Sequence, residues 1–530
     1  MTKQRKKRAL VPDYLSPNQL TLGGFETPFE QALNPKNRWV VLANLIPWDE
    51  ICNLYLKHVG VSTTGRPPIN PRVVIGSVII KHMCNLDDRE TVDQISENVY
   101  MQYFLGFSSF TNQAPFDASL FVEFRKRLGM EQINAINERI MSLKANLEKT
   151  KTNTKEEFGQ DDSNAPKSNS GSSPSASENP ETIDTESKPQ NKGRLLMDAT
   201  ACPQDIAYPT DLDLLSAARE KSEHLIDLLY DVELHEKKPR TYRRLARKRY
   251  LVTAQKKSKS RKTIRQAIGG QLRYLARNLR SIDKLLDAYD EIPLHHKEYR
   301  YFLVIQTLYQ QQKQMYDKCT HQVEHRIVSL HQPHVRPIVR GKANAKTEFG
   351  SKINVSLIDG ISYLDELSWD AFNEGSHLMI YVENFKKRFG YYPAEVLVDQ
   401  IYCTRDNRRD LKLLGIRLIA KPLGRPPAVP IHVRPGQRNP IEGKFGQAKT
   451  AYGLGRIRAR LMGTSESMIA SVILVLNLVK LAGVGALCLI VNKIRSFSAH
   501  YMQIMQLRNR LENPAQKLMN NFSIKIRLAA

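Results

Sequence analysis

The segment AEVLVDQ, residues 394–400, has the pattern of a buried strand that ends at an acid. A helical pattern follows at 405–414 and another apolar strand pattern at 416–420. This order predicts a βαβ-like alternation. In open α/β sheets, ligand and catalytic groups gather at the carboxyl ends of the strands. Asp399 occupies such a place, which makes it the first candidate for chemistry.

A second acid, Asp198, lies inside the strand-like segment RLLMDATAC at 194–202. An acid embedded in an apolar strand costs free energy unless it is paired or binds a cation. Each acid alone could be a satisfied core carboxylate, but two of them in one very basic chain favour a metal site. A further strand that ends in a turn is expected at KINVSLIDG, residues 352–360, followed by a helix over SHLMIYVENFKKRFG.

Glu442 supplies a third acid, in a helix expected to start at Pro440. Asn439 followed by Glu442 is also a good capping-box pattern, so a capping role and a metal role compete for the same carboxylate. Lys449 falls on the same helical face, where its amine would meet a nearby phosphate. Two Mg²⁺ ions about 4 Å apart, held by such acids, clamp both oxygens of an in-line phosphoryl displacement.

The charge balance of the chain favours a polyanionic partner. Its 530 residues include 79 Lys and Arg against 54 Asp and Glu, a net charge of +25. DNA, RNA or an acidic membrane surface would complement such a surplus, and a merely basic or ribosome-associated protein is the alternative. The six cysteines are scattered without a CxxC pair, which fits a reducing cytoplasm rather than a disulfide framework.

The length predicts two or three domains, and composition suggests where they divide. Residues 149–192 are rich in Ser, Asn, Pro, Glu and Lys and predict a disordered linker. It separates a helical N-terminal part, 1–148, from a catalytic part, 193–495. A basic helical insertion is expected at about 211–325, and 496–530 form a C-terminal tail.

Two basic clusters are candidates for DNA binding. The first is Arg125, Lys126 and Arg127, which end a helix capped by Asp117. They fit a helix-turn-helix-like unit or, equally, an ordinary bundle whose last basic residues complement the helix dipole. The second cluster lies in the insertion and predicts salt-sensitive binding to DNA phosphates, with a solvated helix face as the alternative. It consists of Arg243, Arg244, Arg247, Lys248 and Arg249.

Two other features suggest different classes of protein. Met468–Val491 is about long enough to cross a bilayer, but Asn477 and Lys480 in its middle favour a buried helix, then a turn and a short apolar element. Several possible zinc ligands cluster without a standard zinc spacing, so a zinc site is not expected. These residues are Cys319, His321, His325, His331 and His334.

The order Asp198, Asp399, Glu442 resembles the DDE triad of bacterial insertion-sequence transposases, in the broad group named for insertion sequences four and five. The similarity extends to MDAT, RPIVRGK, EFGSKINVSL, LVDQIY and RNPIEGKFGQAKTAYGLGRIRARL, and to the N-terminal segments RPPINPRVVIGSVIIKHMCNLDDRETVDQISEN and FDASLFVEFRKRLG. The family pattern around the last acid is Tyr-x2-Arg-x3-Glu-x6-Lys. Arg438, Glu442 and Lys449 match it, whereas Pro435 replaces the Tyr.

The resemblance implies an α/β ribonuclease-H-like catalytic core with a helical insertion, plus an all-α N-terminal DNA-binding domain. It implies metal-dependent DNA cleavage and strand transfer, with Asp198, Asp399 and Glu442 as ligands of two Mg²⁺ ions that Mn²⁺ can replace. Arg438 and Lys449 would hold transposon-end DNA. The expected partners are double-stranded DNA, both terminal inverted repeats and target, and further copies of the chain in a dimer or larger assembly.

A cytoplasmic, nucleoid-associated protein with no membrane partner is therefore expected. A catalytically inactive, repurposed sequence-specific DNA-binding protein is the alternative. The intact acid triad argues against it, because a pure DNA-binding protein needs no buried carboxylates beside DNA.

Overall fold

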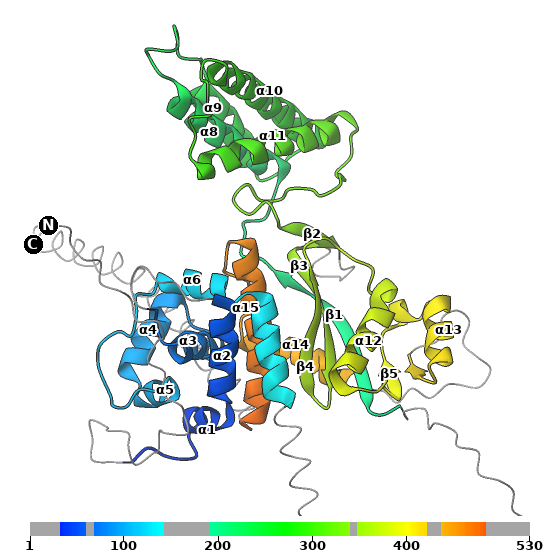
Figure 1. The fold of residues 1–530 in the computed structure, drawn as a ribbon. Coiled ribbons are helices and arrows are strands. Elements are labelled where there is room, and N and C mark those ends of the chain that lie inside the picture. The colour runs from blue at the N-terminus through cyan, green and yellow to red at the C-terminus, as the bar shows by residue number, and fades with distance from the viewer. Residues whose placement is uncertain (1–31, 60–67, 143–190, 340–346, 421–435, 484–530) are drawn as a thin grey trace, which may run out of the picture. The chain divides into compact units, whose positions relative to one another are not determined.

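The computed structural model describes residues 32–59, 68–142, 191–339, 347–420 and 436–483 (Figure 1). The chain divides into two compact units, each assembled from separate stretches. One unit takes the chain up to Phe124, together with Gly446–Gly453 and the chain from Leu474 onward. The other takes Arg125–Phe445 and Leu454–Ile473. The expected linker at 149–192 lies outside the described residues except for its last two positions.

The first unit is helical over the N-terminal residues that the structure describes. Its helices are α1 (Arg38–Leu45), α2 (Trp48–Val59), α3 (Pro71–Cys84), α4 (Asp88–Glu97), α5 (Val99–Phe104) and the start of α6 (Leu120–Arg127). α3 is buried over almost its whole length, as its continuous apolar sequence predicts. The buried Arg72 lies over the Trp48 ring and donates to the Phe104 carbonyl at 3.0 Å. Asp87 caps α4, because its side chain accepts a hydrogen bond from the Glu90 amide.

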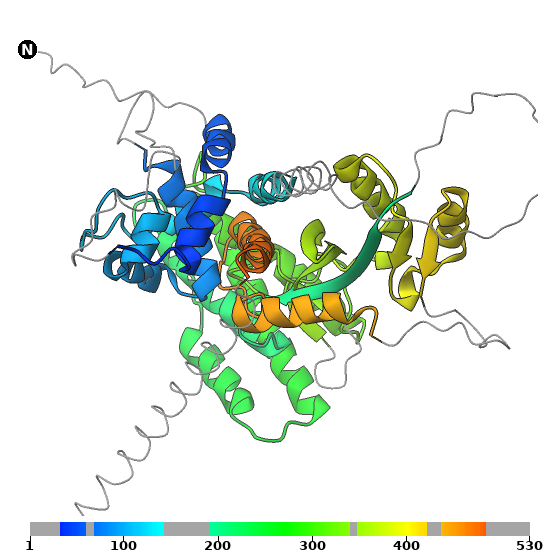
Figure 2. The same ribbon diagram turned by 90° about the horizontal axis from the view of Figure 1, so that it is seen from below.

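The second unit is built on a mixed sheet, whose strands have the order β2-β3-β1-β5-β6, with β4 also paired to β3. β1 is antiparallel to β3 and parallel to β5, and β5 is parallel to β6. Figure 2 shows β1 as a long curved strand. The strands are β1 (Arg194–Pro203), β2 (Arg336–Val339), β3 (Thr347–Ile358), β4 (Ile361–Ser368), β5 (Glu395–Leu397) and β6 (Arg417–Ile419).

Strand β4, which forms a hairpin with β3, was not expected from the sequence. Asp359 and Gly360 join the two strands with φ angles of 50° and 77°. Positive φ at both central residues is the condition for a type I′ turn, and Asp-Gly is a favoured pair for it. The turn expected at the end of KINVSLIDG is confirmed, but the chain continues as a strand before the expected helix begins.

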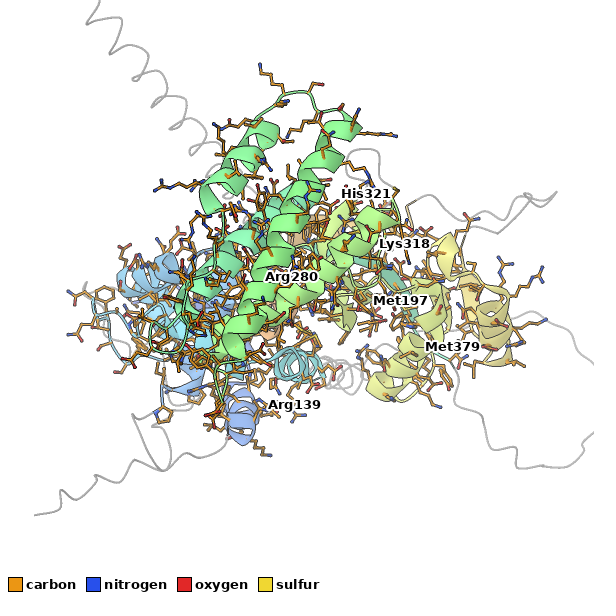
Figure 3. The ribbon with its side chains drawn as sticks, turned by 90° about the horizontal axis from the view of Figure 1, so that it is seen from above. Arg139, Met197, Arg280, Lys318, His321 and Met379 are labelled. Carbon is orange, nitrogen blue, oxygen red and sulfur yellow. The ribbon has the colours of Figure 1, made fainter. Side chains whose placement is uncertain are left out.

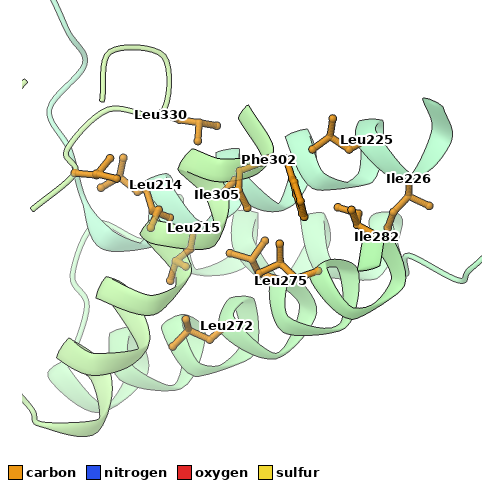
Figure 4. Packing of buried hydrophobic residues seen from close by; sticks show 14 of the residues in the cluster. Leu214, Leu215, Leu225, Ile226, Leu272, Leu275, Ile282, Phe302, Ile305 and Leu330 are labelled. Atoms are coloured by element: carbon orange, nitrogen blue, oxygen red, sulfur yellow. The ribbon is translucent and has the colours of Figure 1, made fainter. Parts of the chain in front are cut away.

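The region expected to be helical between the first and later strands contains four long helices, α8 (Asp211–Leu229), α9 (Arg243–Ala254), α10 (Arg261–Leu286) and α11 (His296–Asp317). They pack around their own apolar core (Figure 4). Leu275, Ile282 and Ile305 in that core are completely buried. Truncating such a Leu to Ala costs about 2–5 kcal/mol in comparable cores.

An ion pair joins the beginning of this helical insertion to its end. Arg326, after α11, forms an ion pair of 2.7 Å with Asp211 at the start of α8. The chain leaves the sheet at Pro203 of β1 and returns at Arg336 of β2, and both residues pair with Gly350 of the intervening strand β3. The insertion therefore has its own core and joins the sheet at β1 and β2, the strands on either side of β3 (Figure 1).

The remaining elements follow β4 along the chain. They are the short turns η3 (Glu374–His377) and η4 (Gln400–Tyr402) and the helices α12 (Leu378–Phe389), α13 (Arg405–Leu413), α14 (Asn439–Ala451) and α15 (Met462–Leu481). α15 is the one helix in the described ranges that is long and apolar enough to span a membrane, yet most of its apolar window is buried in the structure. This confirms the expected buried helix. The second apolar element expected after it lies outside the described residues.

Candidate active site

Asp198 and Asp399 occupy equivalent positions on neighbouring parallel strands. Leu196 of β1 pairs with Leu397 of β5, and each acid lies two residues further along its own chain. Adjacent strands lie about 4.8 Å apart, so this register brings together two acids that are far apart in the sequence. The prediction that the end of β5 carries a candidate group is consistent with this placement.

Arg438 joins the two acids. Its Nη2 lies 3.1 Å from Asp198 Oδ2, and its Nη1 lies 3.1 Å from Asp399 Oδ1. The Arg438 side chain is 26% exposed, whereas those of Asp198 and Asp399 are 19% and 54% exposed. One guanidinium therefore offsets part of the repulsion between two neighbouring carboxylates. This role was not predicted, since Arg438 was expected to contact DNA.

Asp198 is electrostatically perturbed. Burial raises the pKa of its carboxyl from the ordinary 3.8 to about 6, against the opposing effects of the Arg438 charge and of a hydrogen bond from the Ala199 amide. The negative charges of Glu374 and Asp399 raise the pKa further. A carboxylate held in this way gains from any cation that enters, because the cation offsets both burial and like-charge repulsion.

Asp399 has a different local role. Its side chain caps η4 and accepts a hydrogen bond of 2.8 Å from the Gln400 amide. This fixes one carboxylate oxygen and turns the chain sharply after β5. The more exposed Asp399 therefore lies at the solvent side of the acid pair, and the less exposed Asp198 lies at its inner side.

Glu442 lies in the first turn of α14, which begins at Asn439, one residue before the expected start. The Arg438 carbonyl accepts the first helical hydrogen bonds, from the amides of Ile441 and Glu442. The expected cap, Asn439, is therefore already helical. The exposed Glu442 lies four residues beyond Arg438, and the half-buried Lys449 lies seven beyond Glu442 on the same helix.

In the part of the chain that the structure describes, no three His, Cys, Asp or Glu side chains are grouped closely enough to hold a metal ion. Two members of the expected triad thus meet, and Glu442 lies one helical turn from the arginine that touches both. The possible zinc ligands are engaged separately. His331 Nδ1 lies 2.8 Å from the Tyr301 hydroxyl, and His334 packs edge-on against Trp369.

Two polar pairs beside Asp198 were not predicted. Lys352 on β3 forms an ion pair with Glu374 in η3, and Asn354 on β3 donates to the Tyr402 hydroxyl in η4. Lys352, Asn354 and Tyr402 lie in segments whose family resemblance was noted. Glu374, by contrast, carries only the weak signal of an acid before a helix.

Some of the predicted DNA-binding residues already have a partner within the protein, whereas others are exposed to solvent. In the insertion, Arg243 Nη2 lies 2.9 and 2.8 Å from the two oxygens of Asp227, and Arg249 donates to the Tyr274 hydroxyl at 3.1 Å. The side chains of Arg244, Arg247 and Lys248 are exposed. Figure 3 labels Arg280 on α10 and shows nitrogen-tipped side chains along these helices.

The cluster at the end of α6 is divided in a similar way. Arg125 is only 8% exposed, so its guanidinium offers little surface to DNA. Lys126 and Arg127 are exposed. Lys126 and Arg127 are therefore the candidate DNA contacts on this helix.

Comparison with known proteins adds two matches to family models. A transposase domain (DUF772) matches residues 27–127, and a transposase DDE domain matches residues 396–479. The second match includes Asp399, Arg438, Glu442 and Lys449, whereas Asp198 lies outside it. An uncharacterized protein of Rhizobium meliloti, ORF8 in the nfe locus, is 29% identical over 213 residues, which cover 38% of this chain and 82% of that protein. No solved structure matches the chain.

Proposed function

Because this chain is a DDE transposase of the insertion-sequence type, we propose that it cuts DNA at the ends of its element and joins them to target DNA. The observation that carries the proposal is the pair Asp198 and Asp399, set in register on neighbouring parallel strands and bridged by one arginine. DDE domains imply a ribonuclease-H-like fold and generally use divalent metal ions. The mixed sheet and its flanking helices agree with that fold.

We assign Asp198, Asp399 and Glu442 as the metal ligands. The donor set fits a hard divalent cation, because carboxylate oxygens are the ligands that Mg²⁺ prefers. The Arg438 ion pairs support this fit, since both strand acids already share one positive partner. When bound, a pair of Mg²⁺ ions, or Mn²⁺ in their place, would stabilise the attacking and leaving oxygens of a phosphoryl transfer. Asp198 and Asp399 would orient that centre from the sheet, and Glu442 from α14.

We assign Arg438 and Lys449 to the DNA of the element ends. The Arg438 guanidinium would give up its carboxylate partners when a cation is held there, and would then be available to a phosphate. Bidentate contact with phosphate oxygens suits its planar geometry. Lys449, further along the same helix, would supply a second positive charge beside the same strand.

The helical insertion provides a second surface for DNA. Between Glu236 and Asp283 the sequence holds no acidic residue, whereas α9 and the start of α10 are densely basic. The exposed Arg244, Arg247 and Lys248 carry most of the predicted contact, because Arg243 already has a carboxylate partner. Lys126 and Arg127 are the corresponding candidates near the N-terminal helices. Such contacts give sequence-independent binding that weakens as salt rises.

The biological setting follows from this chemistry. We propose that the protein acts in the cytoplasm on nucleoid DNA, as a dimer or larger assembly that pairs the two ends of its element. The substrates are double-stranded terminal repeats and a target duplex. No membrane partner is proposed, since α15 is mostly buried.

The test is strand cleavage of DNA that carries the element's own ends, in Mg²⁺, with wild type, Asp399→Ala and Asp406→Ala. Asp406 is a matched control, because it is an exposed acid on α13 seven residues further along. We expect Asp399→Ala to bind DNA without nicking it and Asp406→Ala to behave as wild type. Equal nicking by all three would refute the metal assignment. Binding without nicking by all three, in Mg²⁺ and in Mn²⁺, would favour a repurposed DNA-binding protein.

A further inference from the structure

A row of three arginines follows α14. Arg456, Arg458 and Arg460 occupy alternate positions between α14 and α15, and all three are exposed. We call these three residues the arginine row. Between Glu442 and Glu466 the sequence holds no acidic residue, so no near neighbour along the chain offsets their charge. Neither the proposed metal ligands nor the DNA contacts proposed above include any member of the row.

The backbone of this segment is fixed to the end of β1. The Ile457 amide donates to the Pro203 carbonyl at 2.8 Å, and the Ile457 carbonyl accepts from the Asp205 amide at 2.9 Å. These two bonds form a parallel bridge between Ile457 and Gln204. The Gln204 side-chain amide also donates to the Ala459 carbonyl. The segment therefore has a fixed, extended backbone rather than that of a free loop.

The extended backbone places the three arginine side chains on one face. Successive side chains of an extended chain point to opposite faces. Ile457 is completely buried and Ala459 is half-buried, so the arginine row lies on the other face, toward solvent. Its members follow one another at about 6.6 Å, because an extended chain rises about 3.3 Å per residue. Three positive charges thus lie along one line with a regular spacing.

Two of the three guanidinium groups have no partner to give up. Arg456 Nη2 lies 3.0 Å from Asp205 Oδ1, although the Arg456 side chain is 68% exposed. Within the described residues, Arg458 and Arg460 take part in no ion pair or hydrogen bond. Binding an anion would therefore cost these two residues no internal contact. Guanidinium groups suit phosphate oxygens, and a line of them suits a polyanion whose phosphates also follow one another along a chain.

The arginine row lies at a defined distance from the acid pair, within the same compact unit. Gln204, which pairs with Ile457, lies six residues beyond Asp198 along β1 and its continuation. Six residues of extended chain span about 20 Å. Each nucleotide of one strand of duplex DNA advances about 3.4 Å along the helix axis. A strand held at the acid pair would therefore pass the arginine row about six nucleotides away.

We propose that the arginine row binds the phosphate backbone of one DNA strand, about six nucleotides from the bond that is cleaved at the acid pair. The inference rests on the proposed function, because it takes the acid pair as the site of cleavage. Contacts to phosphates fix the register and orientation of DNA without reading its bases. The row would thus set which bond of the strand lies at the acids. Arg456 contributes less than the other two members, because Asp205 competes with the phosphate.

The first experiment measures binding of the full chain to a labelled duplex that carries the element's end, by fluorescence anisotropy in EDTA. Arg458→Gln and Arg460→Gln should each lower the slope of the log binding constant against log salt concentration by about 0.9. Asp205→Asn leaves Arg456 without its carboxylate partner and should strengthen binding, a gain that misfolding would not produce. Arg409→Gln is the matched control, because Arg409 is an exposed arginine on α13 that lies beside two acids. It should keep the wild-type slope.

The second experiment tests the position of the contact. In a series of duplexes, one phosphate at a time on either side of the cleavage site is replaced by a neutral methylphosphonate. On one side, the replacement about six nucleotides away should weaken binding of wild type. The same replacement should weaken binding of Arg458→Gln much less, because the positive partner of that phosphate is already gone. Replacements next to the cleaved bond should weaken binding of both proteins equally.

Three results would overturn the inference. They are wild-type slopes in both Arg458→Gln and Arg460→Gln, an equal loss of slope in Arg409→Gln, and methylphosphonate effects that are the same in wild type and Arg458→Gln at every position. If wild type nicks DNA while Arg458→Gln and Arg460→Gln bind as wild type does, only the role of the arginine row fails. If these two variants bind weakly and wild type nicks no DNA in Mg²⁺ or Mn²⁺, the proposed cleavage fails and the DNA contact stands.

Discussion

Acidification should weaken the junction between the helical insertion and the sheet through His334. Its ring packs edge-on against Trp369 at 4.4 Å between centroids, in a small apolar cluster with Val328 and Val335. Within the described residues, neither ring nitrogen has a hydrogen-bond partner. Burial, and then the charges of Arg300 and Arg336, lower the pKa of His334 from 6.5 to about 4.

The sign and size follow from proton linkage. The folded state resists protonation of His334, so its stability is complete above pH 6.5 and is lost as the pH falls toward 4. Between about pH 7.5 and pH 5 the unfolded chain gains nearly a full proton at this histidine and the folded protein almost none. The resulting loss of unfolding free energy is about 2 kcal/mol.

Urea denaturation of wild type and His334→Phe at the two pH values measures this loss. Phenylalanine keeps the contact with Trp369 and cannot titrate, so the variant should lose about 2 kcal/mol less than wild type on acidification. His331→Phe is the control, because His331 is exposed and its pairing with Tyr301 lies outside the cluster. An equal loss in wild type and His334→Phe would refute the reasoning.

Three further outcomes are expected. Asp198→Asn should melt at a higher temperature than wild type at neutral pH in EDTA, since it removes a buried charge; a lower melting temperature by calorimetry would contradict this. Arg247→Gln should lower the slope of the log binding constant for DNA against log salt concentration by about 0.9, and Arg243→Gln should lower it less. Fluorescence anisotropy measures the binding, and equal slopes for the two variants would count against the predicted surface. Gly375→Ala should destabilise the protein by about 1–3 kcal/mol in urea, because its Cβ meets the Ile401 carbonyl, and unchanged stability would show that η3 can move.

Much of the sheet was predictable because its strands carry strong local signals. β1, β5 and β6 are short apolar runs, and Asp198 and Asp399 were conspicuous as acids within or beside them. The parallel register of β1 and β5 then places the two acids side by side. The β4 strand was predictable too, from the Asp-Gly turn before ISYLDELS, but that signal was overlooked.

The other contacts of the site join residues that lie far apart in the sequence, so no local sequence pattern predicts them. Arg438 was expected to bind DNA from its place in the motif, and its ion pairs with two acids arise only when α14 meets the sheet. Lys352 on β3 and Glu374 in η3 are separated by all of β4. Only the folded chain brings their side chains together, so the sequence offered no spacing from which to infer this ion pair.

The way the helical insertion is attached has a consequence for the order of folding. Placing Pro203 of β1 and Arg336 of β2 on either side of Gly350 requires closure of a very long stretch of chain, which costs roughly 4 kcal/mol of entropy if that stretch is still random. Once α8–α11 have formed their own core, the Asp211–Arg326 pair holds the two ends of that stretch together. The sheet then closes over two short connections instead of one long one. An insertion built in this way lowers the barrier to assembling the strands around it, and it can change in length without changing the register that brings Asp198 beside Asp399.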